Sequence, residues 1–122
     1  MSRKILVVDD EPSIVNTVQF ILKNEDYEVI AAYSGEEALE KVRSRNPDLI
    51  ILDLMLPKMK GHTVHKILRV DEKYANIPVI MLTACGDFKK MKEDMETGAI
   101  AYVTKPFDHK VLLGIIKAVL NE

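Results

Sequence analysis

The sequence predicts one α/β domain in which five parallel strands alternate with five helices, a (βα)5 arrangement. Two observations support this fold class. Short apolar segments alternate along the 122 residues with longer segments of helical period. Four of the five apolar segments are continuous rather than alternately polar, as is typical of strands covered by helices on both faces. Because crossovers between parallel strands are right-handed, the sheet would be doubly wound, the middle layer of a three-layer sandwich.

The strands are expected where aliphatic residues run together, and the helices where apolar residues recur at helical spacing. The expected strands are Ile5–Val8, Val29–Ala31, Leu49–Leu52, Val79–Leu82 and Ile100–Val103. The expected helices are Pro12–Asn24, one that begins at Ser34, His62 to about Val70, Asp87–Glu96, and one that runs from Asp108 to the last residue.

Local signals mark several helix ends. Pro12 suits a first helical turn, Ser34 and Glu37 have the spacing of a capping box, and Asp108 can cap the last helix. Apolar residues expected on the inner face of the first helix are Ile14, Val18, Ile21 and Leu22, and those of the last helix are Val111, Leu112, Ile115, Ile116, Val119 and Leu120. Each helix would therefore bury one side against the sheet.

Composition limits the possible function classes. Hydrophobic residues make up 48% of the chain, enough for one core, and we expect residues 1–122 to form a single domain. The net charge of −2 argues against nucleic-acid or membrane binding by bulk electrostatics. The one cysteine, Cys85, excludes an intrachain disulfide and favours a reducing compartment. The first apolar run is too short for a signal peptide or a membrane span, so we expect a cytoplasmic protein.

Three carboxylates fall at strand ends. Asp9 and Asp10 follow the first expected strand, and Asp53 follows the third. With strand order 2-1-3-4-5, ligands bind at the carboxyl ends of strands 1 and 3, where the order reverses. Two carboxylates about 4 Å apart repel by roughly 4 kcal/mol at an effective dielectric of about 20. A hard cation such as Mg²⁺, which prefers oxygen ligands, would relieve this repulsion.

Two further polar residues end neighbouring strands. Thr83 ends the fourth expected strand with a hydroxyl, and Lys105 follows the fifth with an ammonium group. Both would point into the crevice that holds the acids. Phosphoryl transfer needs an acceptor placed in line and donors for the phosphoryl oxygens, and these five residues could supply both.

At these positions the sequence resembles the response-regulator receiver domains of two-component signalling, chemotaxis regulators included. The matching motifs are Asp9-Asp10-Glu11, the segment from Asp53 through Pro57 to Gly61, Thr83-Ala84, and Tyr102 through Lys105-Pro106 to Phe107. Each motif alone is weak, but all four occur in order and at strand ends. The resemblance covers essentially the whole chain and implies the flavodoxin-like form of the three-layer fold.

The resemblance implies roles for individual residues. Asp53 would accept the phosphoryl group, and Asp10, Asp53 and the main-chain carbonyl of Met55 would bind Mg²⁺, with Mn²⁺ able to substitute. Asp9 would act mainly through a metal-bound water. Thr83 would hydrogen-bond the attached phosphoryl group, and Lys105 would contact Asp53 and then the phosphate.

The family also implies a cis Lys105–Pro106 peptide bond. From the residues themselves we expect a conformational switch that responds to the phosphoryl group on Asp53. Thr83 would move toward the phosphoryl group, and Tyr102 would turn from an exposed to a buried position. The domain would catalyse only its own phosphotransfer and dephosphorylation, and is otherwise not expected to be an enzyme.

The implied donor is a phosphohistidine of a sensor histidine kinase or a phosphotransfer protein. The output would be an unidentified partner or a C-terminal effector domain, with no nucleic-acid or membrane binding by this domain. Many receivers joined to winged-helix domains carry an acidic pair between Gly-Ala and Tyr, where this chain has Ile100 and Ala101, and the last helix contains no arginine. We therefore expect a monomer or a weak, phosphorylation-dependent dimer.

Three rival functions use the same architecture. A flavin carrier needs a glycine- and hydroxyl-rich loop after the first strand, whereas Asp9-Asp10-Glu11 would repel a flavin phosphate. A degenerate receiver that only binds partners typically lacks the acceptor, an acid or the lysine, all of which are present. A hydrolase with an aspartyl-phosphate intermediate usually carries a second aspartate where Met55 stands, and is rejected.

Plainer interpretations exist for single residues. Asp9 or Asp10 could only cap the first helix, and Asp53 could be a simple turn residue. Residues expected to be ordinary loop or solvated positions are Cys85, His62, His65, His109, Lys89, Lys90 and Lys92, although the three lysines could also contact a partner.

Overall fold

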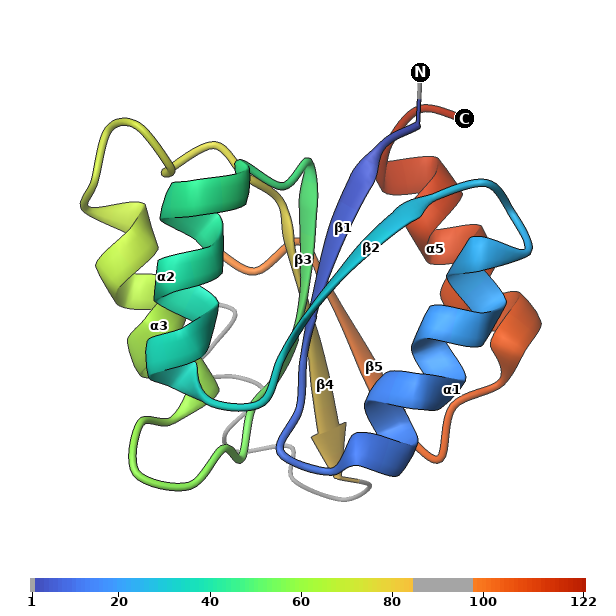
Figure 1. The fold of residues 1–122 in the computed structure, drawn as a ribbon, viewed down its shortest axis with the longest axis horizontal. Coiled ribbons are helices and arrows are strands. Elements are labelled where there is room, and N and C mark those ends of the chain that lie inside the picture. The colour runs from blue at the N-terminus through green and yellow to red at the C-terminus, as the bar shows by residue number, and fades with distance from the viewer. Residues whose placement is uncertain (1, 85–97) are drawn as a thin grey trace.

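The computed structural model describes residues 2–84 and 98–122, and Figure 1 shows their fold. The strands are β1 (Lys4–Val8), β2 (Glu28–Ala32), β3 (Leu49–Asp53), β4 (Val79–Ala84) and β5 (Ala101–Lys105). The helices are α1 (Pro12–Lys23), α2 (Gly35–Arg45), α3 (Gly61–Arg69) and α5 (His109–Val119). The expected helix Asp87–Glu96 lies outside the described residues, as do Cys85 and the three lysines at 89, 90 and 92.

The five strands form one parallel sheet in the order β2-β1-β3-β4-β5. The α2 and α3 helices cover one face of the sheet, and α1 and α5 cover the other (Figure 1). The predicted fold class, strand order and three-layer arrangement are confirmed. Because β1 and β3 are neighbours whose connections leave to opposite faces, their carboxyl ends border a crevice.

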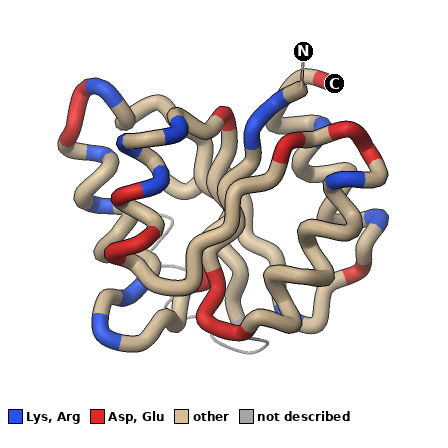
Figure 2. The backbone as a smooth tube through the Cα atoms, in the orientation of Figure 1, with Lys and Arg blue, Asp and Glu red and all other residues tan. Residues whose placement is uncertain are grey.

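The core has two halves, one on each face of the sheet. Leu6 and Val8 of β1 pack toward α2 and α3, whereas Ile5 and Val7 pack toward α1 and α5. Because both faces are covered in this way, the run Ile5–Val8 of β1 contains no polar residue. In Figure 2 the charged residues lie on the helices, the loops and the strand ends, and the middle of the sheet carries none.

Two predicted helix caps are present. The Ser34 hydroxyl accepts a hydrogen bond from the Glu37 N–H at 3.1 Å, and the Glu37 carboxylate accepts one from the Tyr33 N–H at 2.9 Å. In this capping box the Glu37 carboxylate therefore binds the N–H of Tyr33, the residue before the N-cap, rather than that of Ser34. The Asp108 carboxylate accepts hydrogen bonds from the N–H groups of Lys110 and Val111, at 2.8 and 3.2 Å.

Several predicted details are wrong. Val111 is 56% exposed, because only Leu112 and Ile116 of α5 face the sheet squarely, and α5 ends at Val119 rather than at the last residue. In α1 the buried face includes Val15, and Ile14 is only partly buried. Ile100 precedes β5 and is exposed. Val111 lies one position from buried Leu112, and Ile100 lies one position before β5, where the sequence pattern alone is ambiguous; Ile14 still packs against the core on the predicted face.

His65 is a further correction. It was predicted to be solvated, but it is 2% exposed and lies on the inner face of α3 with Gly61, Val64 and Leu68. Burial, and secondarily the charge of Arg69, lower its pKa below the ordinary value. The spacing of these four positions is helical and could have revealed the burial of His65.

The helices described within residues 2–84 and 98–122 include none with the length and apolar character of a membrane span.

Candidate functional site

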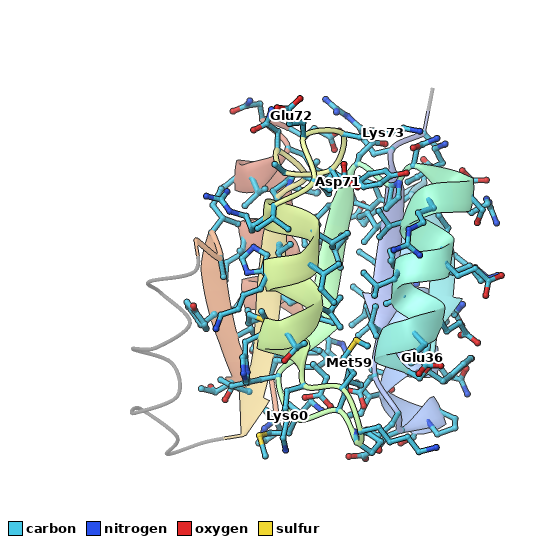
Figure 3. The ribbon with its side chains drawn as sticks, turned by 90° about the vertical axis from the view of Figure 1, so that its left-hand side faces the viewer. Glu36, Met59, Lys60, Asp71, Glu72 and Lys73 are labelled. Carbon is cyan, nitrogen blue, oxygen red and sulfur yellow. The ribbon has the colours of Figure 1, made fainter. Side chains whose placement is uncertain are left out.

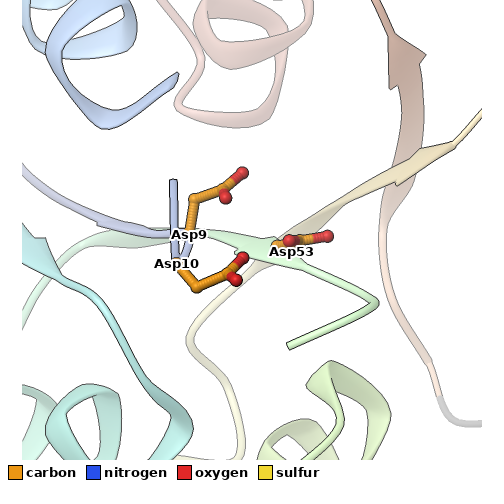
Figure 4. A group of neighbouring side chains, drawn as sticks. All are labelled: Asp9, Asp10 and Asp53. Carbon is orange, nitrogen blue, oxygen red and sulfur yellow. The ribbon is translucent and has the colours of Figure 1, made fainter. Parts of the chain in front are cut away.

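The candidate site lies where β1 and β3 end. Asp9, Asp10 and Asp53 lie next to one another at these strand ends (Figure 4), and one carboxylate oxygen from each lies within 4.8 Å of those of the others. Asp9 is completely buried and Asp53 is 5% exposed, whereas Asp10 is exposed. Ionised carboxylates this close and this poorly hydrated repel one another.

Backbone N–H groups orient the two buried acids. One Asp9 oxygen accepts a hydrogen bond from the Glu11 N–H at 3.0 Å, and one Asp53 oxygen accepts one from the Met55 N–H at 3.1 Å. Each acid thus closes a short turn as the chain leaves its strand, and its second oxygen is left for the crevice. The α1 helix has Glu11 at its N-cap without a side-chain cap, so neither Asp9 nor Asp10 caps it.

Glycine at position 61 allows α3 to begin directly behind Asp53. A Cβ at Gly61 would lie 2.3 Å from the main-chain oxygen of Asp53, a distance that real Cβ atoms do not adopt. The Gly61 N–H donates to the Leu54 carbonyl at 3.0 Å. The loop from Leu54 to Lys60 is therefore held against the end of β3, which fixes the position of the Asp53 side chain.

Lys105 enters the site from the end of β5. Its ammonium nitrogen lies 2.7 Å from one oxygen of Asp9 and 3.4 Å from one oxygen of Asp53. Burial works to lower the pKa of Lys105, but the hydrogen bond to Asp9 and the charges of Asp53 and Asp9 raise it above the ordinary value. Lys105 is therefore a firmly protonated cation between two buried acids.

One cation does not balance three acids. Burial raises the pKa of Asp53 above its ordinary value, and the Asp9 charge adds to this, against the Met55 N–H and Lys105. The site thus carries surplus negative charge when all three carboxylates are ionised. The residues fit a hard divalent cation: the ligand atoms are all oxygens, and exposed Asp10 leaves room for the waters that Mg²⁺ retains.

The other predicted site residues lie on β4 and β5. Asp53 pairs in register with Leu82, so the buried Thr83 is one residue further along the neighbouring strand. Tyr102 on β5 lies opposite Met81, is half-buried and packs against the core under α2 and α3. The Lys105–Pro106 peptide bond is cis.

The remaining histidines do not join the acids. His62 is half-buried at the start of α3 and His109 is exposed at the start of α5. Within the described parts of the chain, the three aspartates are the one group of His, Cys, Asp or Glu side chains close enough together to hold a metal ion.

Comparison with known proteins agrees with this geometry. The family model of the response regulator receiver domain matches residues 5–117. The alkaline phosphatase synthesis transcriptional regulatory protein PhoP of Bacillus subtilis is 46% identical over 121 residues, which are 99% of this chain and 50% of that protein. The chain therefore spans about half the length of the curated relatives it matches.

Solved structures share the fold over nearly the whole chain. The chemotaxis response regulator CheY4 of Vibrio cholerae superposes with a TM-score of 0.91 at 35% identity, covering 98% of this chain and 99% of that one. A CheY-like response regulator receiver domain protein of Methanospirillum hungatei superposes with a TM-score of 0.92 at 30% identity, covering 99% and 95%.

Proposed function

The chain belongs to the response regulator receiver domains of two-component systems, and we propose that it signals by taking a phosphoryl group on Asp53 in a Mg²⁺-dependent reaction. The observation that supports this most directly is the convergence of Asp9, Asp10, Asp53 and Lys105 at one strand edge. We propose residues 1–122 as the receiver domain, working in the cytoplasm.

Asp53 is the best acceptor of the three acids. Asp9 is completely buried and holds Lys105 at 2.7 Å, so its carboxylate is both inaccessible and engaged. Asp10 is exposed to solvent, so its carboxylate is not held in a fixed orientation by burial. Asp53 has one oxygen fixed by the Met55 N–H and the other only 3.4 Å from Lys105, which leaves an oriented oxygen available for attack.

The metal would be held by Asp10, Asp53 and the main-chain carbonyl of Met55, with Asp9 acting through a bound water. When bound, Mg²⁺ supplies positive charge for the phosphoryl oxygens. Lys105 would stay protonated and donate to the transferred group, as its raised pKa favours. Thr83 would donate its hydroxyl to the attached phosphate. The domain would catalyse only its own phosphotransfer and dephosphorylation.

The switch would run from Asp53 to β5. The phosphoryl group adds about two negative charges and acceptor oxygens. We propose that the Thr83 side chain moves toward it and that Tyr102, half-buried on the adjacent strand, changes its packing in response. The phosphate would thereby bias a two-state surface, which an allosteric role requires.

The partners follow from the phosphotransfer. The donor would be a sensor histidine kinase or a phosphotransfer protein, and the output would be an unidentified partner or a C-terminal effector domain. We propose that this domain itself binds neither nucleic acid nor membrane and is a monomer or a weak, phosphorylation-dependent dimer.

Phosphorylation tests the proposal directly. Incubation with Mg²⁺ and acetyl phosphate should add one phosphoryl group per chain by intact-mass spectrometry. The adduct should be acid-stable, base-labile and absent from Asp53→Asn. Glu40→Gln, an exposed change of the same kind on α2, is the matched control and should be phosphorylated normally. An unmodified parent protein would contradict the proposed function.

Metal binding is tested separately from phosphotransfer. Asp10→Ala removes a ligand, whereas Lys105→Ala removes a competing cation. Isothermal titration calorimetry should therefore show that Asp10→Ala weakens Mg²⁺ binding much more than Lys105→Ala does. If Asp10→Ala binds Mg²⁺ as tightly as the parent, the metal assignment is wrong.

The switch has its own test. With beryllofluoride and Mg²⁺ as a phosphoryl mimic, backbone NMR shifts should extend from Asp53 through Thr83 to Tyr102. Thr83→Ala should confine them to the acid site. Shifts that remain beside Asp53 in the parent protein would exclude the coupling.

A further inference from the structure

The loop between β3 and α3 carries two exposed lysines, Lys58 and Lys60, here called the lysine rim. The loop lies at the same edge of the sheet as the acid site. Figure 3 places Lys60 at that edge, and Figure 2 shows basic segments on the loop below α3. Each lysine occupies a backbone position that favours a different residue type.

Lys60 is the N-cap residue of α3. Its side chain makes no capping hydrogen bond, and the first turn of α3 contains no acidic residue. Ser34 and Asp108 cap α2 and α5 with side-chain oxygens. Lysine has no acceptor oxygen, and its positive charge lies at the positive end of the helix dipole. The N-cap of α3 is therefore occupied at a cost to stability.

Lys58 has a φ of 64°, in the left-handed region that favours glycine or asparagine. The Met59 N–H donates to the Pro57 carbonyl at 2.7 Å, so Lys58 is the central residue of a γ-turn, whose form with positive φ is rare and strained. Both lysines thus break a local rule, and nothing in their described contacts compensates. Such positions are where a functional requirement is expected.

The requirement is electrostatic. Three carboxylates and one ammonium group leave the acid site with surplus negative charge, which a bound Mg²⁺ would only neutralise, so the site itself would give no net attraction to the dianionic phosphoryl donors that the proposed function needs. Lys60 precedes Gly61, whose backbone touches that of Asp53, and consecutive Cα atoms are about 3.8 Å apart. The backbone of Lys60 therefore lies beside the end of β3, and the field of an exposed charge there falls off over about one Debye length, roughly 10 Å at 0.1 M salt.

We propose that the lysine rim determines donor specificity, drawing anionic phosphodonors to Asp53 and favouring dianionic over less charged ones. This inference rests on the proposed function and adds residues that lie outside the acid site. With acetyl phosphate, a bond forms from an Asp53 oxygen to phosphorus as the bond from phosphorus to the acyl oxygen breaks. Its electron pair leaves on acetate, so the reaction needs no further reactant. The rim affects the encounter and not this step.

Three substitutions of Lys60 separate charge from structure. Lys60→Ser removes the charge and supplies a capping oxygen, Lys60→Gln removes the charge alone, and Lys60→Arg keeps the charge. The apparent second-order rate constant for acetyl phosphate, from intact-mass time courses with Mg²⁺ at low salt, should fall about twofold to threefold in the first two variants. Lys60→Arg should retain the parent rate.

The substitutions that lower the phosphorylation rate should raise the stability of the folded protein. Lys60→Ser should raise the urea midpoint while slowing phosphorylation, whereas a purely structural role predicts no loss of rate. Lys58→Asn should behave likewise, because asparagine tolerates the left-handed conformation. The control is Lys66→Gln, which removes an exposed charge six residues further along α3, about 9 Å away along the axis. Its rate should match the parent.

Donor charge and salt complete the test. The rate loss should be smaller with phosphoramidate, which carries less negative charge, and should vanish near 1 M salt, where the Debye length is about 3 Å. Equal phosphorylation rates for the parent, Lys60→Ser and Lys60→Gln with acetyl phosphate at low salt would overturn the proposed role of the lysine rim. A parent protein that accepts no phosphoryl group would instead overturn the proposed function on which the inference rests.

Discussion

The two edges of the sheet differ in how their charged side chains are paired and in how far they are exposed to water. At the carboxyl edge, Asp9 and Asp53 are buried and share Lys105. At the amino edge, Glu122 accepts a hydrogen bond from the Tyr27 hydroxyl at 2.7 Å and pairs with Arg3 at 3.3 Å.

A second ion pair near the amino edge joins Lys117 to Glu25 at 3.2 Å, and the charged groups of both pairs there are more than one-third exposed. Glu122 and Glu25 therefore each have a cationic partner and contact with water, whereas the buried acids Asp9 and Asp53 share one cation and have little contact with water. Balanced, hydrated charges are typical of structural contacts, and concentrated, unbalanced charge costs stability and is kept for function.

The largest expected difference comes from removing the shared cation. Lys105→Met leaves Asp9, which is completely buried, without its ion-pair partner. Breaking a buried pair in this way should lower the free energy of unfolding by about 3 kcal/mol. Arg3→Met, at the amino edge, should lower it by less than about 1 kcal/mol, because its pair is exposed. Urea denaturation without metal measures the free energy of unfolding of both variants. Equal losses would contradict the proposed difference between the two edges.

Asp53→Asn should stabilise the metal-free protein. Burial raises the pKa of Asp53, so the folded state binds this proton more tightly than the unfolded chain does. The stability it contributes is present at low pH and is lost as the pH rises through the raised pKa. Near neutral pH, Asp53→Asn should gain about 1 to 2 kcal/mol by removing one of three like charges. Denaturation across pH should show this gain shrinking as the pH falls.

Tyr27→Phe tests the amino edge. Burial first, and then the hydrogen bond and charge of Glu122, raise the pKa of Tyr27 from 10.0 to about 12. The substitution should cost roughly 1 kcal/mol, the net value of one hydrogen bond. In the parent, this contribution is complete below pH 10 and lost as the pH rises to about 12. Ultraviolet titration should show that Tyr27→Phe removes a tyrosinate signal that appears near pH 12 in the parent.

The smallest effect is expected for the exposed pair of Lys117 and Glu25. A double-mutant cycle with Lys117→Met and Glu25→Gln should give a coupling of about 0.5 kcal/mol or less, because solvent screens both groups. Salt should reduce it further. A coupling as large as the loss in Lys105→Met would mean that the two edges do not differ in the way proposed.

The resemblance and the strand pattern predicted the fold correctly for reasons visible in single segments. The apolar runs from Ile5 and from Leu49 mark doubly covered strands, and the caps at Ser34 and Asp108 depend on hydrogen bonds within a few residues. The placement of Asp9, Asp10 and Asp53 at one edge also follows from the sequence once the strand order is known, because parallel strands end together.

Other features depended on distant residues. The exposure of Val111 depends on how α5 is rotated by its packing against the sheet. The preference of Lys105 for Asp9 over Asp53 joins residues 96 positions apart, and their distances are set by how β1, β3 and β5 lie across the sheet.

The sequence by itself determined the elements, their order and which residue types end each strand, since these follow from local periodicity and short-range hydrogen bonds. The tertiary structure alone decided how far the residues beside each buried helix face are exposed, as at Val111, and how one lysine is divided between two acids. The reason is that burial and electrostatic energies depend on distances through space, which a linear pattern does not specify.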